Sequence, residues 1–243
     1  MDDLTPAGEV GAHLLPSALR ARLLALVQER GLTYSPEPFA LSSGGTSHHY
    51  VDLRRAVARG DDLRLAAQAV ARACAVSGIG FDAIGGMTMG ADPVAHAVAL
   101  ATSTSWFSVR KAEKSHGSRR RIEGADLAPG TRVVLFEDTV TTGRSLLEAL
   151  DAVTATGATV VLALTLLDRG EVAAPLVAKR AVPYLALLRY DDVGIEPLPG
   201  PDGTGSLANA PRANATRANA PRANAPQGDS SDVPGTGEGT PTG

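Results

Sequence analysis

The sequence has few of the features that mark secreted, membrane-bound or nucleic-acid-binding proteins. Its one cysteine, Cys74, lies among alanines in a helical pattern, which excludes an internal disulfide and predicts a buried, inert thiol. No window approaches the roughly 18 apolar residues of a membrane span, and no charged segment followed by an apolar run marks a signal peptide. The net charge of −3 gives no sign of nucleic acid or a membrane surface as a partner. These absences favour a cytoplasmic protein.

Composition changes sharply near residue 200. Between Pro201 and Gly243 the only large aliphatic residues are Leu207 and Val233, and the repeats Ala-Asn-Ala-Pro-Arg and Ala-Asn-Ala-Thr-Arg occur there. Such a segment cannot bury enough apolar surface to offset the entropy of ordering it. We therefore predict a disordered, low-complexity tail over residues 201–243, after an N-terminal segment over 1–60 and a folded core over 61–200.

The core region alternates between apolar runs and helical patterns. Helical spacing predicts helices over residues 16–30 and 93–101, 144–156 and 172–179, and Asp61 is a good N-cap for a helix ending near Gly78. Continuous apolar runs predict strands over residues 82–86, 105–109, 132–136, 159–167 and 184–188. This alternation is typical of an α/β fold with a parallel sheet covered on both faces. Ligands of such sheets bind beyond the carboxyl ends of the strands.

One of these carboxyl ends has an unusual run of polar residues, Val133 to Ser145, reading VVLFEDTVTTGRS. We predict a strand, a turn over residues 137–143 and a helix from Arg144. Backbone N–H groups of such a turn and the helix N-terminus attract anions, and hydroxyl donors stand beside them at Thr141, Thr142 and Ser145. Two adjacent carboxylates, Glu137 and Asp138, would instead repel phosphate and attract hydroxyl groups or a cation. A ligand with a phosphate at one end and a diol at the other, such as a ribose 5-phosphate, satisfies both halves.

Other phosphate and nucleophile motifs are missing or misplaced. The sequence has no G-x-x-x-x-G-K-[ST] and no G-x-S-x-G. The run from Gly78 to Ala83 has the spacing of a dinucleotide fingerprint, but it precedes the predicted strand, so we interpret it as a helix stop and turn.

The acid pair followed by Thr-Thr-Gly-x-Ser resembles the signature of the phosphoribosyltransferases that use phosphoribosyl pyrophosphate. The resemblance implies a Rossmann-like parallel-sheet core with a small N-terminal hood. It also implies that Glu137 and Asp138 hold the ribose hydroxyls. The following turn would hold the 5-phosphate through Thr139, Val140, Thr141, Thr142, Gly143, Arg144 and Ser145.

A basic segment follows another predicted strand. Residues 110–121, which we call the basic lid, contain six lysines or arginines and one acidic residue. The pattern Arg-Lys-x-x-Lys-x-His-Gly resembles the flexible catalytic loop of the orotate phosphoribosyltransferases. By that resemblance Arg110, Lys111, Lys114 and His116 contact pyrophosphate, Lys114 and Asp138 are catalytic, and the loop acts in the neighbouring subunit of a homodimer. The run Arg119-Arg120-Arg121 departs from the glycine-rich sequence common there, and leaves the motion of the lid open.

Three further segments resemble the same family. Residues 39–55 are similar to the hood over the base, where Tyr50 is either a stacking wall or a core aromatic, and Ser42 stands where some members have lysine. Residues 85–93 are similar to the pyrophosphate loop, with Met89 at another such lysine position. Arg169 follows a strand; it could be a surface residue, but the resemblance implies that Arg169 and Thr141 hold orotate. Adjacent His48 and His49 lack a third metal ligand nearby.

The resemblance implies a reaction of orotate with phosphoribosyl pyrophosphate that gives orotidine 5′-phosphate and pyrophosphate. Mg²⁺ would be bound through the substrate and water, with no direct protein ligand. The alternatives are a phosphoribosyltransferase for another base, a non-catalytic regulator that senses phosphoribosyl pyrophosphate, and an inactive paralogue. The regulator would need a DNA-binding segment, which residues 1–60 do not suggest. An inactive paralogue would have a broken acid pair or lid.

Overall fold

The computed structural model describes residues 14–40, 46–111 and 121–198, so the predicted tail and residues 112–120 of the lid lie outside the described residues. Its centre is a six-stranded sheet with strand order β5-β4-β3-β6-β7-β8. The strands are β3 (Ala83–Met87), β4 (Ser105–Val109), β5 (Ile122–Gly124), β6 (Arg132–Val140), β7 (Thr159–Asp168) and β8 (Tyr184–Arg189). All neighbours pair in parallel except β5, which runs antiparallel to β4. The predicted parallel sheet is confirmed, and β5 was not predicted.

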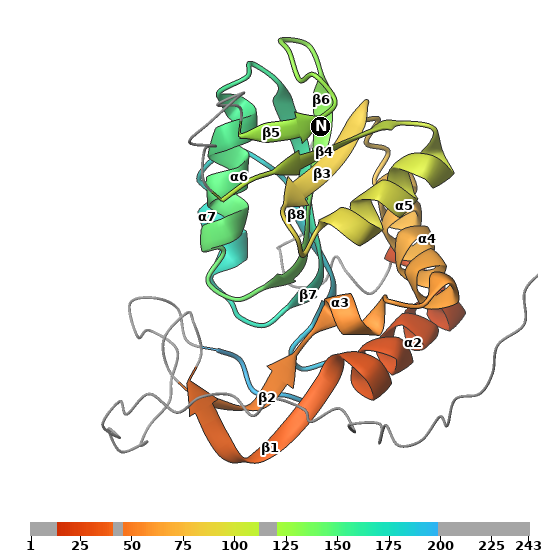
Figure 1. Ribbon diagram of the computed structural model, residues 1–243, viewed down its shortest axis with the longest axis vertical. Helices are drawn as coiled ribbons and strands as arrows, with labels where there is room; N and C mark the ends of the chain where they lie inside the picture. The colour runs from red at the N-terminus through yellow and green to blue at the C-terminus, as the bar shows by residue number, and fades with distance from the viewer. Residues whose placement is uncertain (1–13, 41–45, 112–120, 199–243) are drawn as a thin grey trace, which may run out of the picture. The chain divides into compact units, whose positions relative to one another are not determined.

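Helices cover both faces of this sheet, as predicted (Figure 1). Successive residues of a strand point to opposite faces, so Val134 packs in one apolar cluster and its neighbours Val133 and Leu135 in the other. The first cluster includes residues of α2 (Ser17–Leu26), α4 (Gly60–Val76) and α5 (Asp92–Thr102). The second includes residues of α6 (Arg144–Thr154) and α7 (Ala173–Ala178). Burial on both faces explains why these strands are continuously apolar.

The N-terminal part forms a separate two-stranded sheet, which we call the hood hairpin. After α2 comes a π-helical turn, η1 (Val27–Gly31), and then β1 (Leu32–Ala40) pairs antiparallel with β2 (Thr46–Val51). The short helix α3 (Leu53–Ala56) follows, and the Asp52 carboxylate caps it by accepting a 3.2 Å bond from the Arg55 N–H. The hood hairpin is therefore followed directly by α3 and then by α4, which packs against the sheet.

Several predicted boundaries were wrong. The first helix loses its α-helical hydrogen bonding after Leu26. Asp61 is not an N-cap, because α4 begins at Gly60 with Arg59 at the cap position, and Asp61 lies in the first turn. The largest correction concerns β6, which was predicted to end at Phe136 but continues to Val140 because β7 extends beside it. The two acids are therefore strand residues and not part of a turn.

Two predictions from composition can be compared with the structure. Cys74 is 2% exposed, and burial raises the pKa of its thiol to about 11, so the thiol stays protonated at neutral pH. Within the three described ranges, no helix is both long and apolar enough to cross a bilayer.

Candidate active site

The carboxyl end of β6 and the start of α6 form the wall of a cavity of about 330 Å³. Gly143 makes the connection possible, because its φ of +73° is a left-handed conformation that side chains other than glycine rarely adopt. We call this space the β6 cavity; its lining includes Tyr50, Val51, Glu137, Arg169 and the run from Thr139 to Leu146. The structure therefore brings together the predicted phosphate turn, one acid of the pair and the predicted orotate arginine.

A second cavity of about 240 Å³ adjoins the first, and Val51, Glu137, Thr139 and Ser145 line both. We call it the loop cavity, because residues 87–90 of the predicted pyrophosphate loop form part of its wall. Its lining also includes Asp138 and Lys111. A Cβ on Gly90 would lie 2.6 Å from Asp138 Oδ1, so a larger residue there would require the loop or the carboxylate to shift. Two adjoining spaces that share Glu137 can hold two parts of one ligand.

The two carboxyl groups occupy an environment that disfavours their charge. Glu137 is 8% exposed, and burial, helped by the charge of Asp138, raises its pKa from 4.5 to about 8 against the opposing effect of Lys111. Burial also raises the pKa of Asp138, although the Thr139 N–H bonds it at 2.8 Å and Arg54 attracts it. Glu137 Oε2 is buried without a hydrogen-bond partner among the described residues. A buried carboxyl group with an unused oxygen is suited to bind hydroxyl donors or a hydrated cation.

Arg169 is buried as well, so the alternative of a surface arginine is wrong. It is 4% exposed, and burial lowers its pKa to about 10, which still leaves it protonated at neutral pH. Its backbone N–H donates to the Val140 carbonyl at 2.8 Å, so the turn after β7 lies against the end of β6. Its Nε has no hydrogen-bond partner among the described residues. The β6 cavity is therefore lined by a buried cation that is suited to an anionic ligand.

The structure also shows where the aromatic and histidine side chains of the hood hairpin lie. Tyr50 is 47% exposed, packs edge-on against Phe39 at 5.8 Å between ring centroids and lines the β6 cavity, so the core-aromatic alternative is wrong. The His48 ring lies 5.9 Å from that of Tyr34. Over the described ranges, no group of three or more His, Cys, Asp or Glu side chains could hold a metal.

The basic lid begins and ends on neighbouring strands. The Arg110 N–H donates to the Arg121 carbonyl at 2.8 Å, and an Arg110–Glu123 ion pair of 3.4 Å lies beside it. Lys111 lines the loop cavity, whereas Lys114 and His116 lie outside the described residues. Sequence reasoning missed β5, whose three residues give no periodic signal. Its antiparallel pairing with β4 places Arg110 and Arg121, the two ends of the lid, side by side at the sheet edge.

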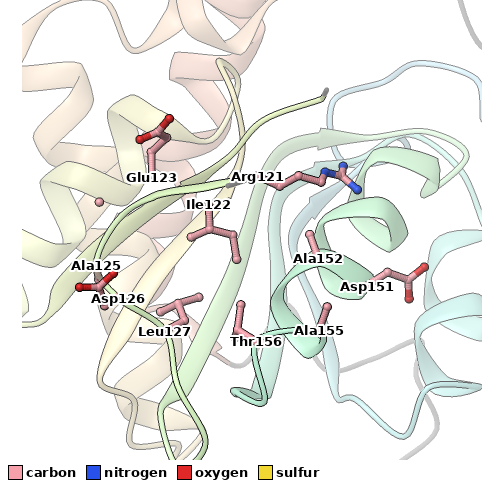
Figure 2. Close-up of a pocket in the computed structure, with 11 residues that line it drawn as sticks. Arg121, Ile122, Glu123, Ala125, Asp126, Leu127, Asp151, Ala152, Ala155 and Thr156 are labelled. Carbon is pink, nitrogen blue, oxygen red and sulfur yellow. The ribbon is translucent and has the colours of Figure 1, made fainter. Parts of the chain in front are cut away.

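A larger cavity, of about 710 Å³, lies elsewhere (Figure 2). Residues 121–127 line one side of it, and residues of α6 and the turn after it line the other, namely Asp151, Ala152, Ala155 and Thr156. None of the residues predicted for the site contributes to this lining. This larger cavity is therefore not part of the candidate site.

Comparisons with known proteins give a consistent result. No family model matches the chain. Orotate phosphoribosyltransferase of Corynebacterium glutamicum is 40% identical over 188 residues, which cover 76% of this chain and 100% of that protein. The Streptomyces avermitilis protein of the same name is 40% identical, over 73% of this chain and 98% of its own length.

Solved structures similar to this chain include members of the same family. Orotate phosphoribosyltransferase of Mycobacterium tuberculosis in complex with 5-phospho-α-D-ribosyl 1-diphosphate is 33% identical, with a TM-score of 0.61 over 76% of this chain and 96% of that one. Adenine phosphoribosyltransferase of Leishmania tarentolae has a TM-score of 0.52 at 17% identity, over 70% of this chain and 88% of its own, and this likeness concerns the fold alone.

Proposed function

Since the chain belongs to the orotate phosphoribosyltransferase family, we propose how its own residues carry out that family's reaction. The enzyme transfers the 5-phosphoribosyl group of phosphoribosyl pyrophosphate to N1 of orotate, giving orotidine 5′-phosphate and pyrophosphate in pyrimidine biosynthesis. The observation that carries the assignment of roles is that Glu137 and Arg169 line one cavity with the Thr139–Ser145 segment, and each has one buried polar atom without a partner among the described residues, Glu137 Oε2 and Arg169 Nε.

The phosphoribosyl group fits the β6 end of the cavity. The 5-phosphate would accept hydrogen bonds from backbone N–H groups and hydroxyls between Thr139 and Ser145, at the positive end of the α6 dipole. Glu137 and Asp138 would accept hydrogen bonds from the ribose hydroxyls. Those bonds favour the ionised carboxylates and so offset the burial that raises both pKa values.

Orotate fits the opposite side of the same cavity. A carboxylate against the Arg169 guanidinium would supply the partner that the Nε lacks and neutralise a buried charge. Thr141 would donate to the base, and Tyr50 offers an exposed ring face beside it. This arrangement accounts for an arginine at a position that a lysine could not fill with the same planar contact.

In the reaction, N1 of orotate bonds to C1 of the ribose as the C1–O bond to pyrophosphate breaks, and the N1 proton passes to pyrophosphate or water. Positive charge grows on the sugar, near Asp138, and negative charge grows on the pyrophosphate, near Lys111. Arg110, Lys114 and His116 add positive charge when the lid closes, and closure excludes water that would hydrolyse the donor. Mg²⁺, held through the substrate and water, would supply further positive charge to the pyrophosphate. The oxygen-rich loop cavity, with an unused Glu137 oxygen, suits a hydrated cation.

We further propose a homodimer in which the lid closes over the partner's site. The lid is rooted at the edge of the sheet, on β4 and β5, and not among the helices that cover its faces. A loop rooted at an edge can extend away from its own subunit. Mixing two inactive variants, one altered in the lid and one at Asp138, would restore turnover in heterodimers if the lid acts in trans.

The direct test follows the loss of orotate absorbance after phosphoribosyl pyrophosphate and Mg²⁺ are added. The chain has three lysines, Lys111, Lys114 and Lys179, which provides a matched control. Lys114→Ala should lower kcat at least 100-fold, by the magnitude typical of removing one transition-state contact, roughly 3 kcal/mol. Lys179→Ala, at an exposed position after α7, should leave kcat unchanged. Equal rates for both variants would refute the role of the lid, and turnover of uracil in place of orotate would refute the base assignment.

A further inference from the structure

The Arg169 guanidinium also bonds to a part of the chain that is remote in sequence. Its second terminal nitrogen donates to the His49 carbonyl at 3.0 Å and to Ser47 Oγ at 3.4 Å, both on β2 of the hood hairpin. The other side-chain hydrogen bonds of this hairpin, among the described residues, stay within it. Arg169 is therefore the hydrogen-bonded link between the hood hairpin and the end of the parallel sheet.

Ser47 is placed to control how this link is oriented. Its hydroxyl donates to the His49 carbonyl at 3.1 Å and accepts the His49 N–H at 3.0 Å. The two acceptors used by the guanidinium are thus fixed relative to one another. Ser47, His49 and Val51 alternate along β2 with the more exposed Thr46, His48 and Tyr50, so the linked residues lie on the less exposed face.

The other end of Arg169 is held by the sheet. Its backbone N–H bonds Val140, and the neighbouring Asp168 carboxylate accepts the Gly170 N–H at 3.0 Å and the Tyr184 hydroxyl at 2.8 Å. With its backbone and one terminal nitrogen both fixed, the guanidinium has little freedom left to rotate. Its Nε is buried without a partner and belongs to a side chain that lines the β6 cavity.

We propose that Arg169 couples the hood hairpin to the orotate pocket, with Ser47 as a positioning residue. The hairpin holds the guanidinium in the orientation that leaves Nε for the orotate carboxylate, and a bound carboxylate in turn strengthens the attachment of the hairpin. The coupling is reciprocal, because a contact that tightens ligand binding through the hairpin must tighten the hairpin through the ligand. The identity of the ligand rests on the proposed function, whereas the link between hairpin and sheet does not.

Amide hydrogen exchange over residues 32–51 tests the link without any substrate. Arg169→Lys keeps the charge, but its ammonium ends one bond short of the terminal guanidinium nitrogen that makes both bonds to β2, so these bonds are weakened or lost. We expect residues 32–51 to exchange at least threefold faster in Arg169→Lys than in the wild type, while the β3 and β6 strands keep wild-type rates. Unchanged exchange over 32–51 would overturn the link.

Orotate binding and kinetics test the coupling. Orotate at saturation should slow exchange over residues 32–51 in the wild type and not in Arg169→Lys. Ser47→Ala should raise the KM for orotate by about threefold to tenfold, as expected for one hydrogen bond, with kcat and the KM for phosphoribosyl pyrophosphate unchanged. Ser47→Thr should restore the orotate KM, and Thr46→Val, which removes a hydroxyl from the exposed face of the same strand, should leave it unchanged.

The outcomes separate the two proposals. A wild type that neither binds nor converts orotate would refute the proposed function, while the ligand-free exchange would still decide the link. An orotate-converting enzyme whose Ser47→Ala variant changes kcat instead of the orotate KM would overturn Ser47 as a positioning residue.

Discussion

Replacement of Glu137 by glutamine should stabilise the protein relative to the wild type, and this advantage should grow as the pH rises. Burial raises the folded-state pKa of Glu137 from 4.5 to about 8. Between these values the folded state holds a proton that the unfolded state has lost, so the free energy of unfolding falls with increasing pH. The slope is about 1.4 kcal/mol per pH unit for one proton. Glutamine cannot ionise and keeps the volume of the side chain, so it removes this dependence.

The difference in unfolding free energy between Glu137→Gln and the wild type should therefore grow by about 2 to 3 kcal/mol from pH 6 to pH 8. Urea denaturation followed by far-UV circular dichroism, with the tail intact and no substrate, measures this difference at each pH. Glu148→Gln is the control, because Glu148 forms an exposed pair with Arg144 at 3.0 Å and should give a difference that is constant and small. A Glu137→Gln difference that stays constant over this range would refute the argument that the acid is buried and protonated.

Three other predictions concern the loops and the metal ion. Gly143→Ala forces an alanine to φ of +73°, which costs about 1 to 2 kcal/mol, and should raise the KM for phosphoribosyl pyrophosphate more than that for orotate. Tyr184→Phe leaves the buried Asp168 without its hydroxyl partner, so thermal or urea unfolding should report a loss of about 1 to 3 kcal/mol and the orotate KM should rise. The matched variant Tyr190→Phe loses an exposed bond to Glu171. It should lower the free energy of unfolding less, and raise the orotate KM less, than Tyr184→Phe does. Excess EDTA should abolish turnover, and added Mg²⁺ should restore it; full activity in EDTA would exclude the proposed metal ion.

The sequence predicted the core strands well because burial on both faces leaves a continuous apolar run. It failed at the end of β6, where polar residues at 137–139 suggested a turn. Pairing with β7, Glu137 opposite Thr165 and Val140 opposite Asp168, extends the strand beyond its apolar part. The local pattern does not contain this information, because the partner strand lies more than 25 residues away in the chain.

The sequence indicated which residue types gather at the candidate site, but it did not indicate how deeply they are buried. The acid pair, the Thr-Thr-Gly turn and Arg169 could be found from their positions after strands. The burial of Glu137 and Arg169 cannot be read from the local pattern, and Arg169 bonds His49, which lies 120 positions away in the chain. The strands of that hairpin were missed because Ser35, Pro36 and Pro38 interrupt the pattern of β1, and the pairing itself carries a register shift between Tyr34 and Phe39.

The short length of β5 has a consequence for solubility. An edge strand exposes backbone groups that can pair with a strand from another molecule and seed aggregation. On the side of the lid, this edge is only three residues long and ends at Gly124, whose φ of +91° departs from extended geometry. An incoming strand would find few groups in register there. The sheet can thus end at β5 without offering a long template for self-association.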